Sequence, residues 1–192
     1  CKEAGFKNIS LDFIYGVPGQ TKQTVQQNMN ALIDLNPEHV STYALTYHEG
    51  TPFFSNRKRG TLIPVAEDLE LSMFKTITAS LTEADYQHYE VSNFAKKGRQ
   101  STHNKSYWNR IPYMALGPGA HGFVQDKASA GIRWENLRRP RDYIDFWLNH
   151  KPKQPDGLST GANWVEHLEP LQEFSEILLC GFRQHRGVEI SI

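Results

Sequence analysis

The strongest constraint on the fold is a strand–helix–strand pattern near the start of the chain. Residues 9–15 form a nearly continuous apolar run with one carboxylate, Asp12, which is typical of a strand buried on both faces of a parallel sheet. Turn-forming residues follow at 16–20, and apolar residues at helical spacing then continue over 21–36. Residues 39–46 form a second strand pattern. This order predicts a βαβ unit with two adjacent parallel strands.

Asp12 is the unusual residue of the first strand pattern. A carboxylate in a buried strand is costly unless it is paired or bound to a ligand. In α/β sheets, ligands bind at the carboxyl ends of the strands. The residues therefore leave two interpretations open for Asp12, a ligand-binding group or a structural hydrogen-bond acceptor. If it binds a ligand, we expect Tyr15 and Gln20 to line the same end of the sheet.

The rest of the chain mixes helix and strand patterns in an α/β order. Residues 4–6 resemble the end of a helix with Gly5 as its stop, and residues 57–60 form a basic, solvated loop. We expect a long helix after Pro64 that ends near residues 84–85, and a helix from Pro140. Strands are expected at 88–94, 113–116 and 131–136, a linker at 152–161 and an amphipathic helix at 166–182.

Charge and cysteine content exclude several classes of protein. The formal net charge is zero, which gives no electrostatic reason to expect a nucleic acid or an anionic membrane as partner. No apolar run has the length of a membrane span, and no signal peptide begins the chain. Cys1 and Cys180 form neither a CxxC pair nor a disulfide framework, which favours a cytoplasmic, reducing location.

The densest group of chemically versatile residues is the sequence HNKSYW at 103–108, followed by a glycine-rich segment at 113–122. Imidazole can ligate a metal, aromatic rings offer flat faces, and glycine lets backbone approach a ligand. No cysteine lies near His103 or His121, so a metal at His103 would have few protein ligands, as heme iron does. The other interpretation is a hydrogen-bonded loop with buried aromatic rings, and this is the interpretation favoured for His121 and the glycines.

Several segments together resemble one known family. Residues 11–21, LDFIYGVPGQT, resemble the fifth-strand signature of the oxygen-independent coproporphyrinogen III oxidase family, whose members are radical S-adenosylmethionine proteins. NPEHVS at 36–41 and YEVSNFA at 89–95 continue the match, which runs from about Ala4 to the end of the chain. HNKSYW at 103–108 is similar to the HNxxYW motif of the heme-chaperone branch, a motif that the true oxidases lack, and residues 113–121 are similar to the next segment of that branch.

The resemblance implies a fold class and a set of site residues. It implies an α/β protein in which 1–97 form the second half of a partial radical-SAM β/α barrel, 98–151 an antiparallel strand extension carrying HNxxYW, and 152–192 the start of a helical C-terminal region. It places Asp12 in the S-adenosylmethionine pocket. It also makes His103, Tyr107 and Trp108 the candidate heme contacts, with His103 as the candidate ligand of heme iron.

The resemblance also implies a function for a longer parent protein. That function is a cytoplasmic heme chaperone that delivers heme to an apo-haemoprotein client and meets membranes only through that client. The alternative is an enzyme, an S-adenosylmethionine-dependent coproporphyrinogen III oxidase that makes protoporphyrinogen IX for porphyrin biosynthesis. The parent would carry S-adenosylmethionine and a 4Fe–4S cluster. The cluster motif CxxxCxxC is absent from this sequence, so we expect a fragment that neither assembles the cluster nor cleaves S-adenosylmethionine by itself.

Overall fold

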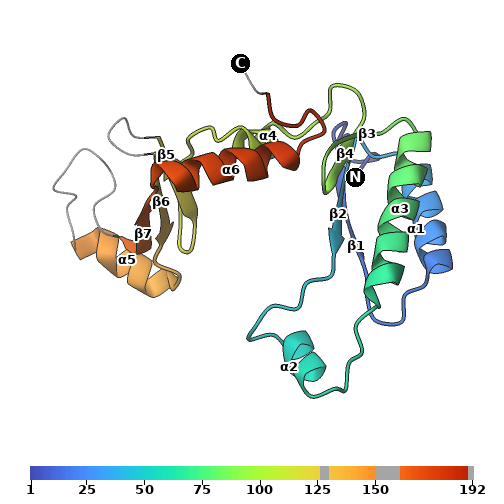
Figure 1. Cartoon of the computed structure of the whole chain (residues 1–192), viewed down its shortest axis with the longest axis horizontal. Coiled ribbons are helices and arrows are strands. Elements are labelled where there is room, and N and C mark those ends of the chain that lie inside the picture. Colours follow the sequence, from blue (N-terminus) through green and yellow to red (C-terminus); the bar gives the residue numbers. More distant parts are fainter. Residues whose placement is uncertain (126–129, 150–160, 190–192) are drawn as a thin grey trace. The chain divides into compact units, whose positions relative to one another are not determined.

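The computed structural model describes residues 1–125, 130–149 and 161–189. It divides into two compact units (Figure 1). Unit 1 comprises Cys1–Thr102 and Gln184–Arg186, and unit 2 comprises His103–Arg183 and Gly187–Ile192. The expected boundary at 151/152 lies outside the described residues, and the division into three parts remains a prediction.

Unit 1 is built on a four-stranded sheet in the order β1-β2-β4-β3. β1 and β2 are parallel and adjacent, and α1 connects them, so the predicted βαβ unit is confirmed. β4 runs antiparallel to both β2 and β3. The elements are β1 (Ser10–Tyr15), α1 (Lys22–Leu35), β2 (His39–Ala44), α2 (Pro52–Lys58), α3 (Glu67–Glu83), β3 (Gln87–Glu90) and β4 (Asn93–Ala95).

Local chemistry sets both ends of α1. The Thr21 hydroxyl accepts a hydrogen bond from the Thr24 N–H, and the Thr24 hydroxyl accepts one from the Thr21 N–H, which forms a reciprocal capping box. Asn36 ends the helix in the left-handed conformation, with φ of 51°. In the turn before the helix, the Gln20 side-chain oxygen accepts hydrogen bonds from the N–H groups of Gly16 and Val17. Gln20 therefore holds the turn together.

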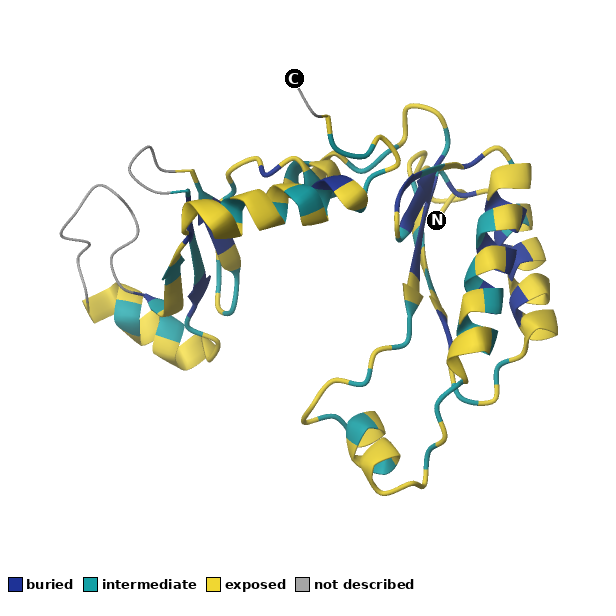
Figure 2. Cartoon of the chain, in the orientation of Figure 1, coloured by how far each residue is buried: buried dark blue, intermediate teal, exposed yellow. Residues whose placement is uncertain are grey.

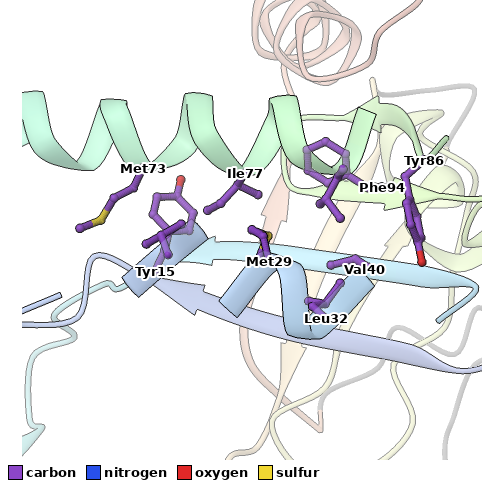
Figure 3. Packing of buried hydrophobic residues seen from close by; sticks show 10 residues of the cluster. Tyr15, Met29, Leu32, Val40, Met73, Ile77, Tyr86 and Phe94 are labelled. Carbon is purple, nitrogen blue, oxygen red and sulfur yellow. The ribbon is translucent and has the colours of Figure 1, made fainter. Parts of the chain in front are cut away.

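The core of unit 1 lies between one face of the sheet and the helices α1 and α3 (Figure 1). Figure 2 shows buried residues on the sides of these helices that face the sheet and exposed residues on their outer sides. Figure 3 shows side chains from both helices and from the sheet meeting in this layer. Each such side chain contributes about 1.5–3 kcal/mol when it leaves water. The fully buried members are Val25, Met29, Val40, Met73, Ile77, Leu81 and Phe94.

β1 is buried on one face only, so the expectation of burial on both faces is wrong for this structure. Leu11, Phe13 and Tyr15 point toward the helices, whereas Asp12 and Ile14 are exposed, Ile14 to 52%. Successive strand residues point to opposite faces, so Tyr15 cannot line a site together with Asp12. The ring of Tyr15 packs in the core, and burial, with the Glu70 charge as a smaller cause, raises its pKa.

Residues 88–94, predicted as one strand, form a tight hairpin of β3 and β4 with a turn at Val91 and Ser92. The Glu90 carboxylate accepts hydrogen bonds from the Ser92 N–H at 2.9 Å and from the Asn93 side-chain amide. These local hydrogen bonds provide partners for polar groups of the turn. The alternation of apolar and polar residues does not reveal such bonds, so it does not predict the turn.

Two smaller expectations also change. Residues 57–60 are only partly a loop, because Arg57 and Lys58 form the last turn of α2. Residues 2–5 form a turn and no helix. Its hydrogen bonds nevertheless match a helix C-terminus: the Phe6 N–H donates to the Cys1 carbonyl and the Gly5 N–H to the Lys2 carbonyl, with Gly5 at φ of 89°.

Unit 2 contains a three-stranded antiparallel sheet in the order β5-β6-β7. The strand predicted at 131–136 and the helix predicted from Pro140 are confirmed, whereas residues 113–116 contribute a single bridge between Tyr113 and Phe123. The predicted helix at 166–182 begins later, at Pro170, because β7 precedes it. The elements are α4 (Thr102–Trp108), β5 (His121–Val124), β6 (Ile132–Asn136), α5 (Pro140–Asn149), β7 (Ala162–His167) and α6 (Pro170–Phe182).

A buried histidine connects three segments of unit 1. His39 Nδ1 lies 2.9 Å from the Ser10 hydroxyl on β1, and Nε2 lies 2.8 Å from the Tyr89 hydroxyl on β3. The Tyr89 hydroxyl also accepts a hydrogen bond from the Ser101 N–H, just before α4. Burial lowers the pKa of His39, while the carboxylates of Asp12 and Glu90 oppose this effect. The ring is therefore neutral in the folded chain at neutral pH.

This environment predicts an acid-sensitive contribution to stability. The folded-state pKa of His39 lies below its unfolded value of about 6.5, so the contribution is complete above pH 6.5 and is lost as the pH falls toward the folded-state pKa. We expect the free energy of unfolding, measured by urea denaturation, to fall less between pH 7.5 and 5.5 in His39→Gln than in the wild type. At pH 7.5 the variant should be about 1–3 kcal/mol less stable, because the buried Tyr89 hydroxyl loses a partner.

His48→Gln is the matched control, because His48 is exposed in unit 1. At pH 7.5 it should match the wild-type free energy of unfolding to within about 0.5 kcal/mol. An equal slope in His39→Gln and the wild type would contradict the assignment.

Candidate functional site

The HNKSYW sequence, expected in a loop, forms the helix α4. His103 and Tyr107 are four residues apart and therefore lie on the same side of the helix. Their ring centroids are 4.7 Å apart and the ring planes meet at 80°, an edge-to-face contact. His103 is exposed, and Tyr107 is 37% exposed. Helix formation thus brings together two of the three candidate heme residues.

The Tyr107 ring continues a series of aromatic contacts into unit 2. It meets the Tyr113 ring edge to face, with centroids 4.6 Å apart. The Tyr113 ring in turn lies 6.2 Å from that of Phe123, which is only 4% exposed. Burial raises the pKa of Tyr113, and Tyr107 adds to this shift. These contacts lead from an exposed imidazole to a buried phenyl group. They define the ring series, which consists of His103, Tyr107, Tyr113 and Phe123.

Trp108, the third candidate, contacts the end of α6. Its ring packs against the guanidinium of Arg183, whose Cζ atom lies 4.4 Å from the ring centroid. Arg183 is the residue that ends α6. The contact is a cation–π pair that joins the end of α4 to the end of α6.

Arg110, a residue that the sequence analysis missed, fixes the position of α4. It is 9% exposed and adopts a left-handed conformation, with φ of 53°. Its guanidinium forms ion pairs with Glu173 at 3.3 Å and with Glu176, both on α6. It also lies 5.1 Å from the Phe123 ring centroid. The only signal in the sequence is the spacing of two glutamates three residues apart on one helix.

Arg133 on β6 completes this cluster of charges. It pairs with Glu176 at 2.8 Å and with Glu166 on β7 at 2.7 Å. The carboxylate of Glu176 is therefore shared between two arginines, one after α4 and one in the sheet. Networks of this kind hold several elements in one arrangement more firmly than isolated surface pairs.

The glycine-rich segment is organised by backbone contacts. The Asn136 side-chain amide donates hydrogen bonds to the carbonyls of Ala115 and Gly117, at 3.1 and 2.9 Å. Gly119 has φ of 68°, which favours glycine. A Cβ on Gly122 would lie 2.2 Å from the Trp134 ring, so only glycine fits there. These contacts agree with a structural role for the glycines.

His121 does not form the expected loop, because it begins β5. Its Nε2 lies 3.9 Å from the carboxylate of Glu135, and its ring meets that of Trp164. Hydrogen bonds from Arg138 and Asn163 hold the pKa of the buried Glu135 well below its usual range, at about 2. Glu135 is therefore ionised and fully engaged with partners on β5, β7 and the turn that follows β6.

Asp12 lies in the middle of β1, opposite Ser41 of β2, on the open face of the sheet of unit 1. It belongs to unit 1, whereas His103 belongs to unit 2. Within the described residues, no group of three or more His, Cys, Asp or Glu could hold a metal ion. Cys1 and Cys180 are both free thiols, and burial raises the pKa of Cys180. No helix in the described part of the chain is long and apolar enough to cross a membrane.

Comparison with known proteins identifies related sequences, although no protein-family model matches the chain. The heme chaperone HemW of Lactococcus lactis subsp. lactis (strain IL1403) is 38% identical over 199 residues, which cover 99% of this chain and 51% of that protein. HemW of Bacillus subtilis (strain 168) is 35% identical over 145 residues, 76% of this chain and 37% of the relative. The radical S-adenosyl methionine domain-containing protein 1, mitochondrial, of Danio rerio is 32% identical over 180 residues, 94% and 39% respectively.

The chain therefore spans about half, or less, of the length of the curated relatives that it matches. Among solved structures, the chain is similar to coproporphyrinogen III oxidase (HemN) from Escherichia coli, described as a radical SAM enzyme. The TM-score is 0.63 at 18% identity, over 94% of this chain and 42% of the other. At this identity the likeness establishes an α/β fold of the HemN type.

The ion pairs of Arg110 predict a large effect of its removal. Arg110→Ala removes this partner from Glu173, while Glu176 keeps its pair with Arg133, and should lower the free energy of unfolding by about 1.5–3 kcal/mol. Arg139→Ala, an exposed control at the start of α5, should change it by less than about 0.5 kcal/mol. Urea denaturation followed by tryptophan fluorescence measures both, and equal stability of the two variants would contradict the role given to Arg110.

Proposed function

Over the part of its relatives that it spans, this chain belongs to the heme chaperone HemW family of radical S-adenosylmethionine proteins, and we propose that its parent protein binds heme and delivers it to apo-haemoproteins. The proposal includes a cytoplasmic location, an apo-haemoprotein client and membrane contact only through that client. The observation that carries it is the exposed imidazole of His103 on α4, at the end of a series of aromatic rings.

The residues of α4 fit a heme group chemically. A neutral imidazole is a common axial ligand of heme iron, and heme bound there would supply the cargo of the chaperone. The Tyr107 ring, partly exposed beside His103, can contact the flat porphyrin. Trp108 belongs to the same motif, and its pair with Arg183 keeps the end of α4 in place. In this proposal His103 binds iron, Tyr107 contacts the ring, and Trp108 stabilises the helix that presents them.

The proposal for unit 1 is that it forms the second half of a partial β/α barrel, with Asp12 in the S-adenosylmethionine pocket. It is supported by the parallel pairing of β1 and β2 and by the exposed position of Asp12 on β1. The parent would also hold a 4Fe–4S cluster. The residues of this chain do not fit the cluster, since the sequence contains no CxxxCxxC motif. Its cysteine ligands would therefore come from another part of the parent.

The second candidate function is that of an oxygen-independent coproporphyrinogen III oxidase. The likeness to HemN is compatible with this activity but does not favour it, because at 18% identity only the fold is shared. The HNxxYW sequence at 103–108 favours the chaperone. An anaerobic assay of the full-length protein with S-adenosylmethionine and coproporphyrinogen III distinguishes the two, and efficient formation of protoporphyrinogen IX would overturn the preference.

Hemin titration tests the role of His103. We expect full-length His103→Ala to bind hemin at least about tenfold more weakly than the wild type and with a shifted Soret band, because an iron ligand is lost. His121→Ala is the matched control, since His121 is also exposed in unit 2 but pairs with Glu135. It should retain the wild-type Soret band and affinity. An unchanged spectrum in His103→Ala would remove this residue from the heme site.

Delivery requires a separate measurement. Hemin-loaded full-length protein is mixed with an apo-haemoprotein, and the transfer is followed by the absorbance change of the acceptor. The chaperone proposal predicts transfer faster than spontaneous release of hemin into solution. Transfer limited by spontaneous release would reduce the proposal to heme binding alone.

A further inference from the structure

We propose that Tyr113, which lies outside the HNxxYW sequence, is a positioning residue that sets the orientation of the His103 imidazole through the ring of Tyr107. The relevance of this orientation to heme rests on the function proposed above. The geometry itself depends only on contacts within unit 2.

The first step is the attachment of Tyr113 to the sheet of unit 2. Its N–H donates to the Phe123 carbonyl at 2.8 Å, and the Phe123 N–H donates to the Tyr113 carbonyl at 2.9 Å. Phe123 lies in β5, its side chain is buried, and the Arg110 guanidinium packs over its ring. The backbone of Tyr113 therefore has a fixed position relative to the sheet.

The second step runs from Tyr113 to the exposed imidazole. The rings of Tyr113 and Tyr107 meet edge to face, and those of Tyr107 and His103 do the same, with an interplanar angle of 80° in both pairs. Edge-to-face contacts are directional, because the positive edge of one ring is attracted to the negative face of the other. Each ring in the series therefore restricts the rotation of the next.

The helix α4 is short. It has seven residues, and a helix of that length has little stability of its own in water, so its packing contacts decide how its side chains are held. One of the contacts that hold α4 in unit 2 is the ring contact between Tyr107 of the helix and Tyr113. The contacts are made by rings, so a phenylalanine at position 113 should serve as well as tyrosine, whereas leucine should not.

A purely structural role for Tyr113 makes a different prediction. In that case Tyr113→Leu would lower the stability of the protein and leave the surroundings of the His103 ring unchanged. The position and width of the His103 imidazole signals in NMR spectra separate the two roles, and this measurement needs no heme.

The experiment uses heme-free full-length protein with ¹³C-labelled histidine, in which the His103 signals are assigned from their loss in His103→Ala. We expect Tyr113→Leu to shift and broaden the His103 signals and Tyr113→Phe to leave them close to those of the wild type. Tyr143→Leu is the control, because its ring contacts Trp147 on α5, outside the ring series. Identical His103 signals in Tyr113→Leu and the wild type would overturn the proposal.

Tyr107→Leu keeps the proposal testable if Tyr113→Leu fails to fold. Tyr107 is partly exposed, so its removal disturbs the core less, and it interrupts the ring series between Tyr113 and His103. The His103 signals should shift in this variant, and unchanged signals would again overturn the proposal.

Hemin release relates this geometry to the proposed function. Dissociation of hemin to an excess of acceptor should be about two- to tenfold faster in Tyr113→Leu than in the wild type, the factor expected for one aromatic contact, and unchanged in Tyr113→Phe. If His103→Ala binds hemin like the wild type, the heme assignment fails while the NMR result still decides the role of Tyr113. If His103→Ala loses hemin but Tyr113→Leu matches the wild type in both measurements, only the positioning role fails.

Discussion

The arrangement of unit 2 depends on one carboxylate, that of Glu176, which two arginines share. Arg110 approaches it from the turn after α4, and Arg133 approaches it from β6. A guanidinium with 9% exposure is costly without partners, so α6 has to lie where Glu173 and Glu176 can reach it. The position of α4, and with it that of His103 and Tyr107, follows from this requirement.

Unit 1 uses a buried polar group in a comparable way. His39 is buried but retains a partner for each ring nitrogen, Ser10 on one strand and Tyr89 on another. Because an unpaired buried polar group costs more than a paired one contributes, both partners fix the register of the strands around the ring. The Tyr89 hydroxyl also accepts a hydrogen bond from the Ser101 N–H. This hydrogen-bond network therefore extends from His39 to Ser101, the residue before α4.

The sequence predicted much of unit 1, because its elements follow from local patterns. The βαβ unit and the helix α3 are both encoded by residues close together in the chain. It predicted less of the site. HNKSYW was expected in a loop, since the spacing of two aromatic residues and a histidine does not reveal a seven-residue helix that is held by distant contacts. Arg110 and Tyr113 were missed as members of the site for the same reason, because their partners lie on α6 and β5.

The sequence by itself determined which residues could do the chemistry and to which family the chain belongs. A motif such as HNxxYW and a turn such as GVPGQT are contiguous, and so they can be recognised without coordinates. Only the tertiary structure decided how those residues are held. It placed Asp12 and Tyr15 on opposite faces of β1, packed Trp108 against Arg183, and joined His103 to Phe123 through two tyrosines. The physical reason is that ring contacts and buried ion pairs join residues far apart in the chain, and no local pattern specifies which partner each residue meets.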